Sequence, residues 1–419
     1  MIRKINKCRI CGNDELVPVV DLGEQYLTGV FPRQDEINSI TKGPLRLVKC
    51  HGRIDSCGLL QLEHSYELGE MYGDNYGYRS GLNKSMVSHL KNKVNNILRA
   101  VDLNPGDLVI DIGSNDGTTL SAFSSNLQLV GVDPTGEKFK EYYPEHIELI
   151  SDFFTDTLIR ASYPNKNAKV ITSFSMFYDL ESPQEFVDQI SNILDPKQGV
   201  WVFEQSYMPL MLERKSYDTI CHEHLEYYSL QQIIWLLDRA GLIIIDLEVN
   251  DINGGSFSVM AAHKASNYLR NDNKINELLL LEKRAELDTI KPFLNFQLQA
   301  QESKKELKEF ISKTKNHGQS ISALGASTKG NVILQYCDID SSQIEEIGEV
   351  NSNKFGTVTP GSMIPINSEE SVLSNEPDYL IILPWHFRDF FVKSSKFIGR
   401  NLVFPLSELE IVTPKKLIL

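Results

Sequence analysis

The stretch that decides the fold is Val109-Ile110-Asp111-Ile112-Gly113-Ser114-Asn115-Asp116-Gly117-Thr118. It predicts a buried strand followed by a glycine-rich turn, with a helix beginning near Thr118. Glycines let the backbone approach a cofactor closely, and a helix start ordinarily favours an anion. Asp116 opposes an anion, because like charges about 4 Å apart repel by roughly 4 kcal/mol at an intermediate dielectric. The turn therefore favours a ligand that carries positive charge.

A second acid follows at the end of the next predicted strand, Leu127 to Val132. Asp133 stands where open α/β folds place the carboxylate that binds a ribose diol. A nucleoside with a cationic centre satisfies both acids, so we predict S-adenosylmethionine as cofactor. NAD is the alternative, and the absence of a Gly-x-Gly-x-x-Gly pattern counts against it. The predicted cofactor contacts are Asp111, Gly113, Asn115, Asp116, Asp133, Asp152, Phe153 and Ser173.

Length and charge narrow the class of protein. A chain of 419 residues is too long for one core and predicts two or three domains. Its net charge of −14 argues against a nucleic-acid partner. No apolar run approaches the roughly 18 residues of a membrane span, and the polar start lacks the apolar core of a signal peptide. We expect a cytoplasmic protein without a membrane partner, as a monomer or weak dimer, whose cysteines are reduced.

Four of the six cysteines lie within the first 57 residues, as Cys8-x-x-Cys11 followed by Cys50 and Cys57. Two thiolate pairs predict a structural zinc site, because tetrahedral zinc takes four such ligands. The second pair is spaced more widely than usual, so the intervening loop must bulge outward, and His51 could compete as a ligand. A redox pair or unliganded buried thiols is the alternative.

The pattern beyond residue 70 alternates between strands and helices. A helix is expected from Met86 to Val101, followed by strands near Leu108, Leu127, Ile147, Val170 and Val200 and a helix from Leu230 to Ala240. Two further strands, Leu242 to Glu248 and Ser256 to Ala262, are joined through Asn253-Gly254-Gly255 and predict a hairpin. Five parallel strands that end in such a hairpin match the seven-stranded methyltransferase sheet.

The last third predicts another α/β unit behind a helical linker. Residues 273–317 read as one helical pattern that Pro292 interrupts, packed between domains or forming a coiled coil. The strand and turn Ile321-Ser322-Ala323-Leu324-Gly325-Ala326-Ser327-Thr328-Lys329-Gly330 follow, with later strands at 344–349 and 379–383. The hydroxyls and Lys329 suit a diphosphate; a turn without a ligand is the alternative.

Two segments carry groups suited to binding and proton transfer. Residues 71–81 form a glycine- and tyrosine-rich stretch, which is either a binding surface or lid, or an ordinary linker. Residues 217–228, Tyr-Asp-Thr-Ile-Cys-His-Glu-His-Leu-Glu-Tyr-Tyr, hold a histidine pair with adjacent carboxylates. A histidine oriented by a carboxylate is a ready general base near neutral pH. Metal binding and structural, helix-capping histidines are the alternatives.

Taken together, these motifs resemble the three-domain sugar C-methyltransferases, which methylate a ring carbon of nucleotide-linked keto-deoxysugars. The resemblance rests on the cysteine cluster, residues 76–81, 113–117, 222–224, 253–256 and 325–330. It implies an α/β protein with a small zinc-binding domain (1–70), a central seven-stranded Rossmann-like methyltransferase domain (71–268), and linker helices with a C-terminal Rossmann-like domain that binds the sugar nucleotide (269–419).

The resemblance also implies roles for individual residues. His224 would be the base, with Glu223 and Tyr76 lining the reaction centre and with Tyr78 and His222 as donors to the ketone oxygen. Tyr76, Tyr78, Arg79, Asn253, Ser327 and Lys329 would bind the substrate. An enolate forms only where a base faces the carbon and donors face the oxygen, so this set suits the reaction.

One departure from the family concerns the residue before His-Glu-His. Family members often carry tyrosine there, and this chain has Cys221, so Tyr217 or Tyr227 could supply the missing hydroxyl. An O- or N-methyltransferase acting on a related sugar nucleotide is the alternative function. A zinc-ribbon interaction protein with a vestigial core is disfavoured by Asp111, Asp116 and Asp133.

Overall fold

The N-terminal part is an antiparallel sheet that a strand from the middle of the chain completes. In the computed structural model, which describes residues 2–53, 55–71 and 79–414, the strand order is β11-β4-β3-β2. β11 (Glu226–Tyr227) pairs with β4, opposite Gln61 and Leu60. The other elements of this part are β1 (Arg3–Lys4), β2 (Leu16–Tyr26), β3 (Lys42–Cys50), β4 (Leu60–Leu62), β5 (His64–Ser65) and α1 (Leu68–Met71).

The central part is the predicted seven-stranded sheet, in the order β12-β13-β10-β9-β6-β7-β8. Six strands run in the same direction and β13 runs antiparallel between β10 and β12, which confirms the predicted hairpin. The strands are β6 (Leu108–Ile112), β7 (Gln128–Val132), β8 (Ile147–Ile150), β9 (Ala168–Phe174), β10 (Val200–Ser206), β12 (Leu242–Asn250) and β13 (Ser256–His263).

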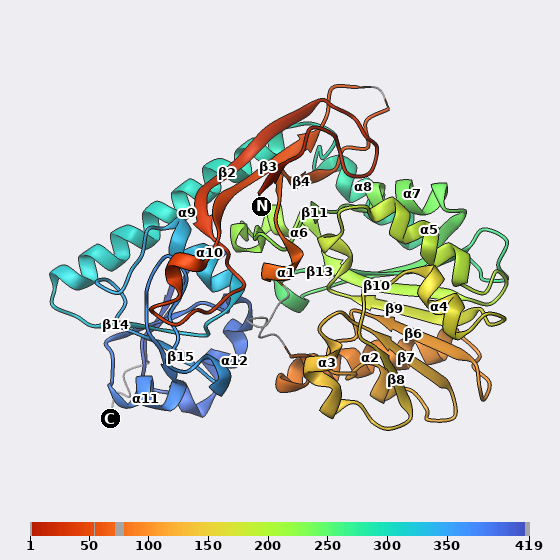
Figure 1. Cartoon of the computed structure of the whole chain (residues 1–419). Helices are drawn as coiled ribbons and strands as arrows, with labels where there is room; N and C mark the ends of the chain where they lie inside the picture. Colours follow the sequence, from red (N-terminus) through yellow and green to blue (C-terminus); the bar gives the residue numbers. More distant parts are fainter. Residues whose placement is uncertain (1, 54, 72–78, 415–419) are drawn as a thin grey trace.

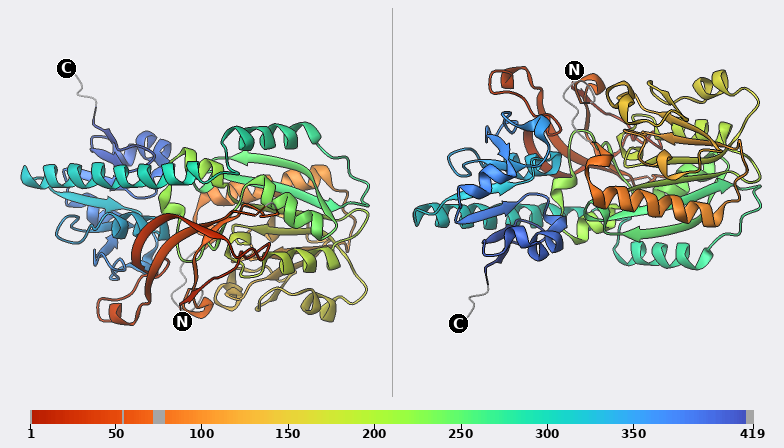
Figure 2. Two further views of the ribbon diagram at one scale, coloured as in Figure 1. Left: turned by 90° about the horizontal axis from the view of Figure 1, so that it is seen from above. Right: turned by 90° about the horizontal axis from the view of Figure 1, so that it is seen from below.

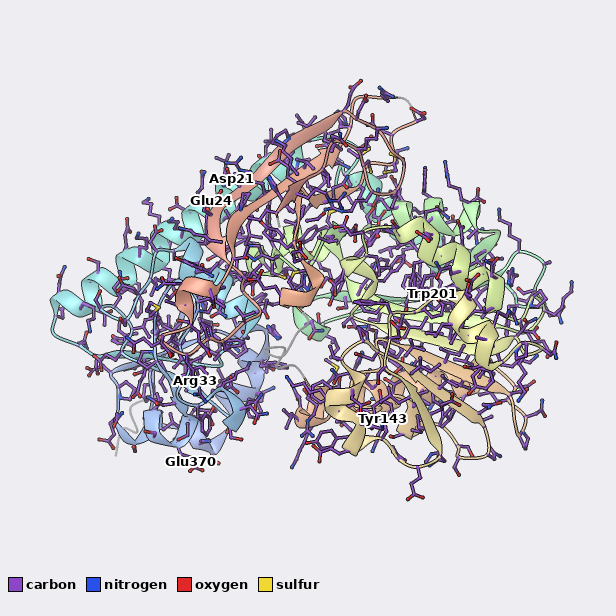
Figure 3. All side chains as sticks on the ribbon, in the orientation of Figure 1. Asp21, Glu24, Arg33, Tyr143, Trp201 and Glu370 are labelled. Atoms are coloured by element: carbon purple, nitrogen blue, oxygen red, sulfur yellow. The ribbon has the colours of Figure 1, made fainter. Side chains whose placement is uncertain are left out.

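Helices cover both faces of this sheet because its buried strands are apolar on both sides. Val94 and Ile97 of α2 pack on one face, and Val187 of α5 and Ile233 of α7 pack on the other. Figure 3 labels Trp201, a fully buried residue of β10. The helices are α2 (Lys84–Ala100), α3 (Gly136–Phe139), α4 (Asp156–Ser162), α5 (Pro183–Ile193), α6 (Met208–Glu213) and α7 (Leu230–Arg239).

The linker is two helices, as Pro292 predicted. α8 (Asp272–Arg284) ends before the proline, and α9 (Lys291–Asn316) begins with it, since proline is tolerated in a first helical turn. Figure 2 shows α9 running along the C-terminal part. α9 packs against β2 and β14, so the packed helix is the alternative that this chain adopts.

The C-terminal part is a second α/β layer structure, also as expected. Its sheet has the order β16-β15-β14-β17-β18-β19, parallel except for β19. Figure 1 shows this part beside the central one, with β2 and β3 spanning the top of both. The elements are β14 (Ile321–Leu324), α10 (Thr328–Tyr336), β15 (Ile347–Glu349), β16 (Ile366–Ser368), α11 (Glu369–Ser374), β17 (Tyr379–Ile382), α12 (Arg388–Lys393), β18 (Leu402–Phe404) and β19 (Glu410–Val412).

Candidate functional site

The glycine turn follows β6, but the helix expected near Thr118 is absent. The chain makes only one turn of 3-10 helix, Leu120–Ala122. Gly113 has φ +72°, and a Cβ built on it would lie 3.1 Å from Cγ of Met176. Asn115 also has positive φ, at 51°. The tight left-handed turn takes the place of a helix start, so the site offers no long helix dipole to an anion.

Asp133 lies directly after β7 and is held by three donors. Its Oδ2 accepts from the backbone N–H of Asn115 at 2.8 Å. Its Oδ1 accepts from the backbone N–H and the hydroxyl of Thr135 at 2.7 and 2.6 Å. A carboxylate has about four acceptor positions, so one position remains for a ribose hydroxyl.

Asn115 and Asp116 hold the segment that precedes α2. The side-chain oxygen of Asn115 accepts from the backbone N–H of Ser80 at 2.9 Å, and Oδ2 of Asp116 accepts from that of Gly81 at 2.8 Å. A Cβ on Gly81 would lie 2.5 Å from that carboxylate oxygen, so only glycine fits. These two predicted cofactor residues therefore also link the turn to the end of the tyrosine-rich stretch.

Asp111 lies beneath the turn rather than on its surface. It is buried, and its Oδ1 accepts from the Thr172 hydroxyl at 2.6 Å. Burial raises the pKa of the Asp111 carboxyl to about 7. Nearby, the Tyr143 hydroxyl donates to the carbonyl of Asn115 at 2.9 Å, which fixes the turn from the side. Asp111 is placed to shape the turn.

The remaining predicted cofactor residues separate into exposed and buried ones. Asp152 and Phe153 follow β8 and are exposed, with Oδ1 of Asp152 accepting from the backbone N–H of Phe153 at 2.7 Å. Ser173 is fully buried, and its hydroxyl accepts from the Trp201 indole at 2.9 Å. The side chain of Ser173 thus belongs to the core of the sheet, and its contact with the cofactor stays a prediction.

Asp133→Ala tests the cofactor assignment. We expect adenosylhomocysteine to bind more weakly by about 1.5 to 3 kcal/mol, the range for losing a hydrogen bond to a charged group. Calorimetry measures this, with the exposed Glu137→Ala as the matched control. Sugar-nucleotide binding should barely change; an equal loss for both ligands would mean that the assignment is wrong.

His224 has the geometry of a neutral base. Its Nδ1 lies 2.9 Å from the carbonyl oxygen of Thr219. A carbonyl only accepts, so Nδ1 carries the proton and Nε2 keeps its lone pair. Burial, reinforced by the charge of Lys329, lowers the pKa of His224 to about 3. The orienting group is thus a backbone carbonyl, where the sequence had suggested a carboxylate.

Glu223 projects toward the N-terminal part. A Cβ built on Gly29 would lie only 1.7 Å from Oε1 of Glu223, so this glycine makes room for the carboxyl group. Burial raises the pKa of Glu223 to about 7. Near neutral pH the carboxyl group is therefore partly protonated and can donate a hydrogen bond.

His222 is packed into the protein, and its role as a donor to the ketone oxygen stays a prediction. Only 1% of its surface is exposed, and its ring lies edge-on against Tyr66, with 4.6 Å between ring centroids. Its Nδ1 lies 3.5 Å from the hydroxyl of Thr28. Burial lowers the pKa of His222 to about 3. The structure favours packing over catalysis for this histidine.

Both tyrosines that could replace the hydroxyl missing at Cys221 are buried. Tyr217 is fully buried against Tyr336, and Tyr227 is 3% exposed within β11. Cys221 is itself fully buried. Both side chains belong to the hydrophobic core, and their suggested role stays a prediction.

Lys329 of the C-terminal part acts on the candidate base His224 through its charge. Its ammonium donates to the carbonyl of Asn253 at 2.5 Å, and its charge depresses the pKa of His224. The Trp385 indole donates to the buried Asp218 at 2.8 Å and fastens the same junction. Ser327 caps α10, its hydroxyl accepting from the backbone N–H of Gly330 at 3.1 Å.

Among the predicted residues of the tyrosine-rich stretch, only Arg79 can be placed. Its guanidinium stacks on Tyr142, 4.0 Å from the ring centroid. Tyr76 and Tyr78 lie outside the described residues. Arg79 immediately precedes the backbone that Asn115 and Asp116 hold, so this candidate substrate residue stands beside the glycine turn.

Tyr178 is a site residue that sequence reasoning missed. Its ring centroid lies 4.2 Å from that of His224, and its carbonyl accepts from the backbone N–H of Leu225 at 2.8 Å. Two residues earlier, Met176 meets Gly113. This short segment after β9 thus brings the candidate base next to the glycine turn. Its position at the carboxyl end of a parallel strand was the available signal.

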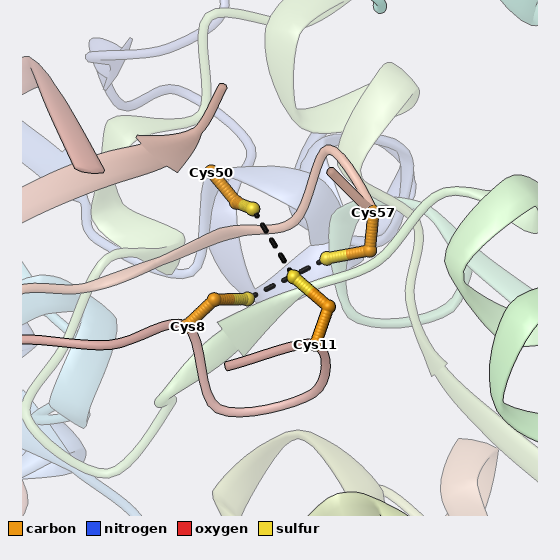
Figure 4. A group of neighbouring side chains, drawn as sticks. All are labelled: Cys8, Cys11, Cys50 and Cys57. Carbon is orange, nitrogen blue, oxygen red and sulfur yellow. Dashed lines mark hydrogen bonds between the residues drawn. The ribbon is translucent and has the colours of Figure 1, made fainter. Parts of the chain in front are cut away.

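The four predicted cysteines converge (Figure 4). Their sulfur atoms all lie within 4.8 Å of one another, with 3.5 Å between Cys8 and Cys57 and 3.4 Å between Cys11 and Cys50. Tetrahedral zinc with bonds of about 2.3 Å requires sulfur atoms roughly 3.8 Å apart, and a disulfide about 2.05 Å, so the spacing fits a metal. His51 is not part of this cluster, and the described residues of its loop are at least partly exposed.

The surroundings of the cluster match its negative charge. The buried Lys49 ammonium donates to the carbonyl of Gly58, next to Cys57. The Asn13 amide donates to the sulfur of Cys50 at 3.4 Å. Four thiolates around a divalent ion leave a net negative charge, which a neighbouring cation and N–H donors stabilise.

Family models match the chain in three blocks. Residues 8–72 match a model described as "Putative zinc binding domain", residues 86–247 one described as "Methyltransferase domain", and residues 251–406 one described as "C-methyltransferase C-terminal domain". The chain carries the domain set of a C-methyltransferase. The methyltransferase model contains the glycine turn and His224, and the C-terminal model contains Lys329.

A full-length relative agrees with this domain set. The C-methyltransferase NovU from Streptomyces niveus is 27% identical over 99% of this chain and 98% of its own. The similarity to this relative therefore runs through all three blocks that the family models match. Among the described residues, no helix is both long and apolar enough to cross a membrane.

Two solved methyltransferase structures each match less than half of this chain. An S-adenosylmethionine-dependent methyltransferase from Clostridium acetobutylicum is 14% identical, covering 42% of this chain and 92% of its own, with a TM-score of 0.32. Magnesium protoporphyrin IX methyltransferase from Synechocystis is 15% identical, covering 47% and 92%, with a TM-score of 0.33. Such low scores add nothing to the family matches.

Proposed function

We propose that this protein is an S-adenosylmethionine-dependent C-methyltransferase, which methylates a carbon next to the ketone of a nucleotide-linked keto-deoxysugar. The observation that carries the proposal is the neutral His224, whose Nδ1 is bound to the Thr219 carbonyl and which lies against Tyr178, beside the glycine turn. A carbon nucleophile must first lose a proton, whereas a hydroxyl or amine is already nucleophilic. A dedicated base therefore favours C-methylation over the O- or N-methyl alternative.

In the proposed reaction, Nε2 of His224 accepts the proton from the carbon next to the ketone. The charge left on the substrate delocalises onto the ketone oxygen, where a protonated Glu223 or Tyr78 would donate a hydrogen bond. S-adenosylmethionine, when bound, would supply the electrophilic methyl group that the enolate carbon takes up, with adenosylhomocysteine as the second product. The positive charge of Lys329 disfavours protonation of His224. The negative charge of the enolate would offset this repulsion once the proton has been transferred.

The proposed cofactor contacts are those at the carboxyl ends of β6, β7 and β8. Asp133 would accept from the ribose hydroxyls, and Asp116 would favour the sulfonium charge. Asp152 and Phe153 would border the adenine ring of the cofactor. The contacts that shape the turn are Asp111, Gly113 and Asn115.

The proposed substrate contacts come from two sides of the junction. Tyr76, Tyr78 and Arg79 would approach from the stretch before α2. Ser327 and Lys329 would face the diphosphate, and Asn253 holds Lys329 through its carbonyl. We also propose that the four cysteines hold a structural zinc ion, because their sulfur atoms are unpaired and correctly spaced.

Solvent exchange tests the reaction type. Incubated with adenosylhomocysteine and a keto-deoxysugar nucleotide in deuterated water, the protein should introduce deuterium at one carbon next to the ketone. With S-adenosylmethionine, mass spectrometry should show the gain of one methyl group on carbon. Methyl gain on oxygen or nitrogen without exchange would contradict the proposal.

The raised pKa of Glu223 predicts a pH dependence. If its protonated form donates to the ketone oxygen, kcat should fall as pH rises through about 7, because the donor is lost while His224 stays neutral. Glu223→Gln keeps a donor and should flatten this fall between pH 6 and 9. The exposed Glu213→Gln is the control. A Gln variant with the wild-type profile would remove Glu223 from this role.

A further inference from the structure

Arg9 stands inside the cysteine knuckle, between Cys8 and Cys11, yet its side chain leaves the knuckle and enters the protein. Only 2% of that side chain is exposed. Nη1 donates to the carbonyl of Leu62 at 2.7 Å, and Nη2 donates to the hydroxyl of Ser65 at 2.9 Å. Arg9 thus ties the knuckle to β4 and β5.

The same guanidinium reaches the strand that follows the candidate base. Nε of Arg9 lies 3.6 Å from Oε1 of Glu226, which is fully buried, and 3.7 Å from Oε2 of Glu181. Within the described part of the chain, neither carboxylate oxygen of Glu226 has a hydrogen-bond donor. Burial raises the pKa of this carboxyl group, and the charge of Arg9 acts against that shift. Removal of the arginine would leave the buried group without this neighbouring cation.

Glu226 lies two residues after His224, and the intervening residue is held on both sides. The carbonyl of Leu225 accepts from the backbone N–H of Leu62 at 2.9 Å, and its own N–H donates to Tyr178. Arg9 contacts the same two strands: it donates to the carbonyl of Leu62 in β4, and it lies beside the carboxyl group of Glu226 in β11. A shift of β11 relative to β4 would consequently move His224 away from Tyr178.

We infer that Arg9 is a positioning residue for His224: by pairing with the buried Glu226, it makes the cysteine knuckle hold the strand behind the base. The inference rests on the proposed function for the role of His224. It gives the N-terminal cysteine site a part in the geometry of the reaction centre, beyond stabilising its own sheet.

If Arg9 only stabilised the fold, its substitution would have different effects. Its loss would lower the melting temperature, while the surviving folded protein would turn over normally. A positioning Arg9 affects kcat in the folded protein, because the cofactor and sugar-nucleotide contacts lie on other elements. The exchange rate of backbone amides in residues 221–228 separates the two and needs no activity.

The experiment compares Arg9→Met, Arg9→Lys and Glu226→Gln with Arg46→Met in the full-length protein as purified. Arg46 pairs with Asp21 in the same sheet, with both side chains about half exposed, and is the matched control. We expect Arg9→Met to lower kcat at least tenfold with KM changed less than threefold, and amides of 221–228 to exchange at least tenfold faster. Glu226→Gln should act in the same direction, and Arg9→Lys should recover part of the effect.

Metal content, measured by mass spectrometry, shows whether the knuckle itself survives. If Arg9→Met loses metal, the amide exchange of Glu226→Gln tests the inference in its place, since this substitution leaves the cysteine knuckle unchanged. Wild-type amide exchange in 221–228 for both Arg9→Met and Glu226→Gln would overturn the inference. A wild-type protein that neither exchanges the sugar proton nor transfers methyl would refute the proposed function instead, and amide exchange would still decide whether Arg9 holds this strand.

Discussion

His224→Ala and His224→Gln are expected to lower turnover by about 10²- to 10⁴-fold, the usual effect of removing a general base. The structural reason is that Nδ1 is committed to the Thr219 carbonyl, which leaves Nε2 as the proton acceptor. Both variants should still bind adenosylhomocysteine and the sugar nucleotide. They should also fail to exchange the substrate proton with deuterated solvent.

His222→Ala is the matched control for that result. His222 is packed against Tyr66, so its loss should affect stability more than exchange of the substrate proton. Near-normal turnover in the His224 variants, together with lost exchange in His222 or Tyr76 variants, would mean that the base is one of those residues. The burial of His222 makes this outcome unexpected on structural grounds.

Cys50→Ser is expected to abolish metal binding and to destabilise the N-terminal sheet. Structural zinc contributes folding free energy directly, about 10–16 kcal/mol in isolated zinc-finger peptides. Within this larger structure, a loss of a few kcal/mol would lower Tm by on the order of 10 °C. Calorimetry and metal analysis by mass spectrometry measure the two effects.

Cys337→Ser is the control for that experiment. Cys337 is also a buried free cysteine, but it contacts Tyr217 and lies outside the four-sulfur cluster. It should keep one equivalent of zinc. Wild-type protein purified without chelator that contains less than half an equivalent of zinc would contradict the proposed site.

The sequence alone predicted the elements whose signal is local. The apolar run that became β6 and the Asn253-Gly254-Gly255 turn report conformation through neighbouring residues, so the parallel strands and the hairpin agree with the structure. Pro292 marked the break between α8 and α9 for the same reason. The prediction of a helix near Thr118 is wrong. The backbone has positive φ at Asn115 and at Gly117, which makes a tight turn where a helix start was expected.

The site was predicted less completely, because its members meet through tertiary contacts. The histidines 222 and 224 are equivalent in the sequence, and only packing distinguishes them: one faces Tyr66, the other Tyr178 and Lys329. Tyr217 and Tyr227 looked available for the same reason and are buried. Ser173 occupies a plausible strand position, but alternation along β9 turns its hydroxyl toward Trp201.

By itself, the sequence determined which functional groups are available. These are four thiols with metal-ligand spacing, carboxylates after two successive strands, and a segment rich in side chains that can donate or accept protons. Residue type and spacing along the chain suffice for these. The tertiary structure decided which groups meet, joining Arg9 of the cysteine knuckle to Glu226, and Lys329 to the carbonyl of Asn253. Such contacts join residues far apart in the chain, 76 positions for Lys329 and Asn253, and depend on burial and strand register, which no local pattern in the sequence encodes.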